Sequence, residues 1–160
     1  MENRRVVITG IGAISCLGNS VKETWEALLA GRCGIDTITR FDMSEYRTRI
    51  AGEIKNFDIT KYMSDKEARR LDDFCHYAIA ATDEALLDAG FPLDFRAEGS
   101  PVDPERVGVC IGSGIGGMRT MEEQCMKLLQ SGPSRVSPFL IPMMILDMAK
   151  PYCGTSEESH

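Results

Sequence analysis

Apolar residues along the chain alternate between short β-branched runs and longer stretches with helical spacing. Residues 6–9 and 107–111 are compact apolar runs followed by glycines, a pattern typical of a buried strand that ends in a tight turn. Another strand is predicted near residues 49–54. Strands separated by helices favour an α/β protein with a largely parallel sheet.

Three helices are predicted where apolar residues recur every three or four positions. The first begins after Asn19 or Ser20 as its N-cap. The second begins after Ser64 and runs unbroken to Gly90, and the third covers residues 118–129. A glutamate three residues after Ser20 and after Ser64 completes a capping box at both starts. Because sheets usually have about five strands, two clear buried strands predict an incomplete sheet.

The composition is that of a soluble domain. The chain has 160 residues, 43% hydrophobic content and a formal net charge of −6 spread over both signs, which disfavours binding to nucleic acid. No apolar run is long enough to cross a membrane, and the N-terminus lacks the features of a signal peptide. We therefore expect a cytoplasmic location and thiols rather than disulfides at the cysteines. Cysteine and histidine spacing predicts no metal site.

The glycine run at residues 112–117 satisfies the G-x-G-x-x-G pattern between a predicted strand and a predicted helix. This pattern has two interpretations: a turn that binds dinucleotide pyrophosphate, or a place of close backbone packing. The segment after the helix, residues 132–138, is not a strand that ends in an acidic residue, which the nucleotide interpretation needs. Close packing is therefore favoured.

Two further features have both a structural and a functional interpretation. Residues 139–146 are a dense apolar cluster, which predicts equally well an ordinary buried helix or the lining of a hydrophobic substrate site or subunit interface. His76 lies within the second predicted helix, where a structural role is favoured over a role as catalytic base. His160 is the terminal residue, where disorder is expected.

Nine segments together resemble, in order, the β-ketoacyl–acyl carrier protein synthases, and specifically the elongating synthase II. The resemblance covers residues 1–149, which we take as the N-terminal β-ketoacyl synthase region, and leaves out residues 150–160, which we expect to be a frameshifted or disordered tail. The segments that carry the resemblance are residues 5–12, 17–19, 25–35, 39–42, 50–53, 66–72, 103–109, 112–117 and 136–145.

The resemblance implies a fold, a reaction and partners. The fold is the incomplete N-terminal half of a thiolase-like α/β fold, which has layered α-β-α-β-α architecture in the full-length family and forms homodimers. The reaction is a decarboxylative Claisen condensation between an acyl-enzyme and malonyl–acyl carrier protein in fatty-acid elongation. Acyl carrier protein with its acyl and malonyl groups is the implied partner, and no cofactor or metal is implied.

The implied catalytic set of one cysteine and two histidines lies beyond the matching region, so we assign no catalytic residue here. A thiolate nucleophile needs a lowered pKa, as at a helix N-terminus. Cys153 follows Pro151-Tyr152 rather than a β-branched strand and has no helix-forming sequence after it, so we do not expect it to be the nucleophile. The chain by itself is predicted to be inactive.

By the resemblance, four residues contribute to substrate binding: Gly114, Ile115, Leu140 and Ile141. Ile115 would gate the acyl pocket, and the two residues of the apolar cluster would reach a pocket across the dimer interface. The family commonly has phenylalanine where this chain has Leu140, which implies a wider pocket. The alternatives from other functional classes are a non-catalytic partner of a full-length synthase and a nucleotide-binding α/β domain.

Overall fold

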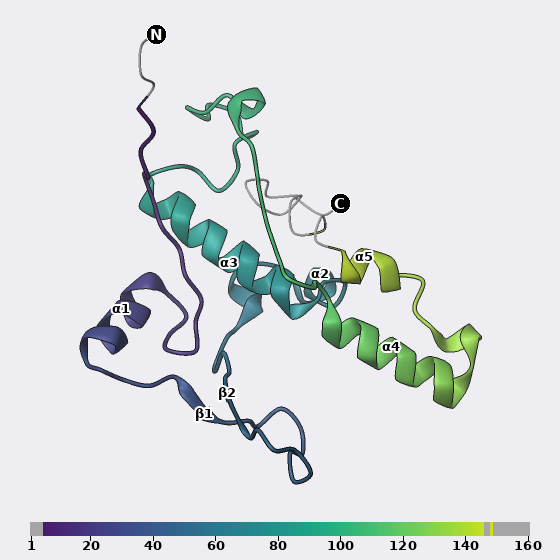
Figure 1. Cartoon of the computed structure of the whole chain (residues 1–160). Coiled ribbons are helices and arrows are strands. Elements are labelled where there is room, and N and C mark those ends of the chain that lie inside the picture. The colour runs from purple at the N-terminus through teal and green to yellow at the C-terminus, as the bar shows by residue number, and fades with distance from the viewer. Residues whose placement is uncertain (1–4, 146–147, 149–160) are drawn as a thin grey trace.

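The computed structural model describes residues 5–145 and 148. The predictions for Leu146, Cys153, His160 and the tail at 150–160 lie outside the described residues. Most of the regular structure in the described part is helical, with three single 3-10 turns between the helices (Figure 1). The helices are α1 (Val21–Leu29), α2 (Asp65–Ala68), α3 (Asp73–Asp88), α4 (Met118–Ser131) and α5 (Leu140–Met144). The strands are β1 (Ile35–Thr37) and β2 (Ile50–Gly52).

The predicted helix starts are confirmed. Ser20 is the N-cap of α1, and its side chain accepts a hydrogen bond from the Glu23 amide. The Glu23 side chain accepts from the Asn19 amide rather than from the Ser20 amide, so the capping box predicted at this start is incomplete. Ser64 and Glu67 form a complete capping box at the start of α2. These starts depend on residues within one turn of each other, so the local sequence determines them.

The prediction of one unbroken helix from Ser64 to Gly90 is wrong. The helix stops after Ala68, and α3 begins only after Asp72, whose backbone is extended with ψ of 161°. The carboxylate of Asp72 makes no hydrogen bond to α3, the helix that it precedes, but accepts hydrogen bonds from Thr120 in α4. The break in the helix therefore accompanies a contact between residues 48 positions apart.

The core lies along α3. Leu71, Cys75 and Ile79 form its buried cluster, and Ile111 and Tyr62 pack against it. The apolar spacing that predicted the long helix therefore identified the buried face correctly, although the helix is broken.

The predicted strands at residues 6–9 and 107–111 are not strands in the structure. Both segments are extended but have no ladder partner among the described residues, and Val6 and Ile8 remain 93% and 86% exposed. The sheet of the described part is the antiparallel pair β1–β2, in which Ile35 pairs with Gly52. Strand β2 confirms the strand predicted near residues 49–54. An apolar run becomes a strand only where another strand offers its backbone groups.

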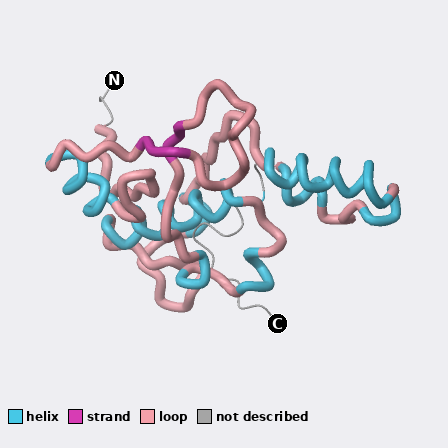
Figure 2. The backbone as a smooth tube through the Cα atoms, turned by 90° about the horizontal axis from the view of Figure 1, so that it is seen from below, coloured by secondary structure: helices cyan, strands magenta, loops and turns pink. Residues whose placement is uncertain are grey.

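The chain exposes far more surface than a compact protein of its size. Its accessible area is 12,092 Å² at 17.7 kDa, whereas a folded monomer of this mass exposes about 8,000 Å². Helices α4 and α5 project from the rest as an arm, as Figure 2 shows. In the described part no helix has the length and apolar character needed to span a bilayer.

Candidate functional site

The four predicted substrate-binding residues lie on two neighbouring elements. Gly114 and Ile115 belong to the glycine turn before α4, and Leu140 and Ile141 begin α5. The amide of Gly117 donates to the Met144 carbonyl at 3.1 Å, which joins the end of the turn to the end of α5.

Two of these four residues expose apolar side chains. Ile115 is 74% exposed and Ile141 60% exposed, whereas Leu140 is half-buried. A Cβ atom added to Gly114 would meet nothing within 4 Å, so space is open around the turn. The structure thus brings the two elements together but leaves their apolar surface uncovered.

The last two glycines of the turn are packed against α5. A Cβ atom at Gly117 would lie 2.8 Å from the Met143 carbonyl oxygen, closer than real side chains approach, and one at Gly116 would crowd the Met144 carbonyl. Gly116 also has φ of +83°, which favours glycine. The close-packing interpretation of this glycine run is therefore confirmed for these two positions.

The N-terminus of α4 is already capped by a carboxylate. Gly117 at its N-cap has no side chain to accept hydrogen bonds, and Asp72 Oδ2 accepts instead from Thr120 N at 2.9 Å and from Thr120 Oγ1 at 2.6 Å. Asp72 and Thr120 are only 8% and 3% exposed. A pyrophosphate at this helix end would have to displace a buried carboxylate, so the geometry disfavours dinucleotide binding.

His76 has a structural role, as predicted. Its Nε2 lies 2.9 Å from the Ala68 carbonyl oxygen, and its Nδ1 lies 3.8 Å from Asp73 Oδ1. Asp73 Oδ2 also accepts from Arg40 and Arg119, each at 3.3 Å. Both ring nitrogens of His76 therefore face polar groups: the carbonyl of Ala68 at the end of α2 and the carboxylate of Asp73 at the start of α3. No disulfide joins the cysteines of the described part.

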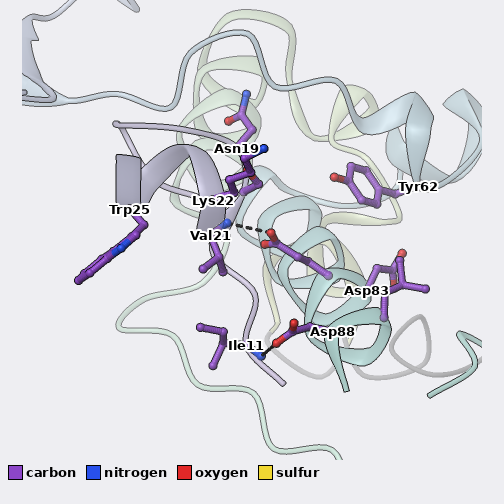
Figure 3. A pocket seen from close by; sticks show the side chains of 11 residues that line it. Ile11, Asn19, Val21, Lys22, Trp25, Tyr62, Asp83 and Asp88 are labelled. Atoms are coloured by element: carbon purple, nitrogen blue, oxygen red, sulfur yellow. Dashed lines mark hydrogen bonds between the residues drawn. The ribbon is translucent and has the colours of Figure 1, made fainter. Parts of the chain in front are cut away.

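The structure also contains a cavity that the sequence did not predict. A groove of about 880 Å³ lies between α1 and α3, with Trp25 on one side and Tyr62 and Asp83 on the opposite side (Figure 3). Its apolar walls are Ile11, Val21, Trp25, Leu87 and the Tyr62 ring, and its polar lining includes Asn19, Ser20, Lys22, Asp83, Glu84 and Asp88. The apolar spacing of the first helix predicted a buried Trp25, but the side chain is 59% exposed in the wall of this groove.

Carboxylates on α3 fix the geometry of this groove. Glu84 accepts from Val21 N at 2.8 Å, which caps α1, and from Ala13 N at 2.9 Å. Asp88 accepts from Ile11 N at 3.0 Å. These bonds hold α1 and the N-terminal segment against α3, so the groove has a defined wall on each side.

Asp83 differs from its two acidic neighbours on α3. It makes no hydrogen bond or ion pair with any described residue, and burial raises its pKa to about 6. Desolvation, followed by the negative charges of Asp83, Glu84 and Glu23, also raises the pKa of Tyr62. The groove therefore combines apolar walls with a negative potential.

Replacement of Asp83 by asparagine is expected to stabilise α3 at neutral pH. The pKa of Asp83 rises from 3.8 to about 6 on folding, so the folded state loses stability as pH rises through that window. With allowance for partial solvent screening, the gain at pH 7.5 is about 1 kcal/mol, or roughly fivefold slower amide exchange in α3. Hydrogen exchange of α3 amides measures it, and the gain should shrink as pH falls toward 4. A gain independent of pH would contradict this cause.

Comparison with known proteins agrees with the resemblance found in the sequence. Residues 3–150 match the family described as "Beta-ketoacyl synthase, N-terminal domain". The chain is 46% identical over 149 residues to 3-oxoacyl-[acyl-carrier-protein] synthase 2 of Synechocystis sp., a match that covers 93% of this chain and 34% of that protein. The chain thus spans about a third of the length of this relative.

Solved structures show the same fold. The ishigamide ketosynthase/chain length factor superposes with a TM-score of 0.72 at 27% identity, over 91% of this chain and 35% of that one. A type II PKS ketosynthase in complex with its acyl-carrier protein superposes with a TM-score of 0.68 at 23% identity, over 91% and 37%. The described residues are therefore a partial α/β structure of the thiolase-like ketosynthase fold, and the chain belongs to the β-ketoacyl synthase family, whose N-terminal domain it matches.

Proposed function

We propose that residues 1–149 supply the N-terminal region of a 3-oxoacyl–acyl carrier protein synthase II. The parent enzyme would condense an acyl-enzyme with malonyl–acyl carrier protein in a decarboxylative Claisen reaction that elongates fatty acids. The observation that carries this proposal is the match to the family over residues 3–150, together with 46% identity to a synthase 2. Acyl carrier protein is the proposed partner, and a solved ketosynthase holds such a protein.

The contribution of this region would be to substrate binding. We assign Gly114 and Ile115, from the glycine turn, and Leu140 and Ile141, from α5, to an acyl pocket in a cytoplasmic homodimer. The contact between Gly117 and Met144 supports this assignment, because it holds the two elements together. The exposure of Ile115 and Ile141 supports it too, since apolar side chains left uncovered in one chain are available to a substrate or a second subunit.

A chimera tests the proposal. The matching N-terminal region of the Synechocystis synthase is replaced by residues 1–149 of this chain, and condensation of acyl- with malonyl–acyl carrier protein is measured. We expect turnover, because the replaced region contributes packing and pocket walls rather than the reacting groups. A folded dimeric chimera that shows no turnover would refute the proposed function.

The chain alone is expected to give no turnover in the same assay. The reaction needs a thiolate nucleophile and donors that stabilise the enolate and the oxyanion. His76, the histidine of the described part, has its ring against Ala68 and Asp73 rather than against a cysteine. Turnover by the purified chain above a blank without enzyme would show that this prediction is wrong.

The pocket assignment has its own test in the chimera. Leu140→Phe introduces a larger side chain at α5 and should shift the preference toward shorter acyl groups, because a bulkier wall shortens the space available. Leu129→Phe is the matched control, since Leu129 is 81% exposed on α4 and lies outside the assigned pocket. Equal shifts in acyl-chain preference in both variants would show that Leu140 does not line the acyl pocket.

A second candidate is a non-catalytic partner of a full-length synthase. It is favoured by the exposure of Phe139, Ile141 and Ile145, at 47%, 60% and 42%. Such an apolar face could dock on another protein. Failure of the chain to co-purify with the intact synthase from the same cell would exclude this role.

A further inference from the structure

We propose that the groove between α1 and α3 is a binding site for an amphipathic organic cation, namely a primary amine carried on an apolar body. This site is separate from the proposed acyl pocket, which lies on the glycine turn and α5. It is supported by three independent features of the groove: its size, the chemistry of its walls and the distribution of charge around it.

The size and walls suit a small apolar molecule. The volume of about 880 Å³ lies within the range of ligand sites, which is roughly 300–1,000 Å³. Val21 and Trp25 of α1 and Leu87 of α3 line the groove, and Tyr62 lies on the side away from Trp25 (Figure 3). An apolar body between these walls would be removed from water on both sides.

The charge around the groove selects a cation. Asp83, Glu84 and Asp88 line it from α3, whereas Lys22 is the one basic residue among the described residues that line it. Burial first, and then the negative charges of Asp83, Glu84 and Glu23, raise the pKa of Tyr62, so these charges act on the space around its ring. An ammonium group would relieve this potential and could also rest on an aromatic face.

Asp83 is the residue expected to pair with the ammonium group. Glu84 and Asp88 already accept backbone hydrogen bonds that hold α1 and the N-terminal segment. Asp83 lines the same groove, makes no hydrogen bond or ion pair with any described residue, and has lost part of its hydration to burial. A half-buried carboxylate without a partner gains most from a charged donor, because it no longer has full hydration to give up.

The single tryptophan of the chain provides the readout, because Trp25 lies in the groove wall. The probes are 4-phenylbutylamine and the neutral 4-phenylbutanol, which share one apolar body. At pH 7.5 we expect a saturable change in Trp25 emission with the amine, and at least tenfold weaker binding of the alcohol. Titration at two chain concentrations tenfold apart distinguishes ligand binding from association of the chain. Equal affinities for amine and alcohol would overturn the proposal.

Matched variants test the role of Asp83. Asp83→Asn should weaken amine binding about tenfold and leave alcohol binding unchanged, whereas Glu122→Gln, an equal charge change on exposed α4, should change neither. An equal effect of the two variants would show that net charge, not the groove, attracts the amine. The fold of each variant is checked by circular dichroism.

A pH titration of the unaltered chain gives a second test that needs no variant. The charged and titratable groups around Asp83 are Lys22 and Glu23 of α1, Tyr62, and Glu84 and Asp88 of α3. Because the pKa of Asp83 is about 6, amine affinity should fall between pH 7.5 and 5 toward that of the alcohol. Amine affinity that is constant over this range, or no saturable binding at any pH, would refute the site.

Discussion

The purified chain is expected to self-associate and to lack the sharp cooperative melt of a monomeric domain. Its accessible area of 12,092 Å² exceeds the roughly 8,000 Å² of a compact monomer by far more than a standard protein interface buries, about 1,600 Å². Much of the apolar surface that should form a core is therefore in contact with water. Burial of one large apolar side chain contributes about 1.5–3 kcal/mol, and a whole domain is stable by only about 5–15 kcal/mol.

The extended segment at residues 6–9 is the expected centre of this association. Val6, Val7 and Ile8 are 93%, 66% and 86% exposed, so both faces of the segment are open. Its backbone groups have no ladder partner in the described part, and an unpaired apolar edge is a template for another chain. A run of this kind is typical of a strand that is covered on both faces.

Sedimentation velocity measures the association, and thermal unfolding by circular dichroism measures the cooperativity. Ile8→Lys should shift the chain toward smaller species, because a charge on the edge opposes pairing. Leu129→Lys places the same charge at a side chain that is 81% exposed on α4 and should have little effect. A soluble monomer with a sharp melt would contradict the prediction. Equal effects of both variants would show that residues 6–9 do not cause the association.

Local sequence predicted what local interactions decide. The caps of α1 and α2 follow from serine and glutamate three residues apart, and the end of α1 follows from Gly31 with φ of +65°. The family followed from ordered motifs, which need no knowledge of contacts. The glycine run was predicted to be a packing turn because the sequence after α4 did not suit a nucleotide.

Long-range contacts explain what the sequence did not predict. Whether residues 6–9 form a strand depends on a partner strand, and the apolar run alone does not specify one. The break before α3 accompanies the bond from Asp72 to Thr120, which no local pattern indicates. The groove brings together residues near 21–25, 62 and 83–88, so its lining becomes apparent only in the folded chain.

The pair Asp72 and Thr120 gives the sharpest test of how this region holds together. Asp72, the residue just before α3, supplies the carboxylate that caps the N-terminus of α4, and both partners are buried. Asp72→Ala would leave the amide and the hydroxyl of Thr120 without an acceptor. Loss of a charged acceptor from buried donors costs about 2–4 kcal/mol, which corresponds to roughly 30- to 700-fold faster local opening.

The measurement is hydrogen exchange in peptides that cover α4, because the cap acts on its first turn. Asp73→Ala is the matched control one residue further on. Asp73 pairs with Arg40 and Arg119, whose side chains are 50% and 64% exposed, and such surface pairs contribute only about 0–1 kcal/mol. Asp72→Ala should therefore accelerate exchange in α4 far more than Asp73→Ala does. Equal acceleration in the two variants would mean that general charge loss, and not the buried cap, couples α4 to α3.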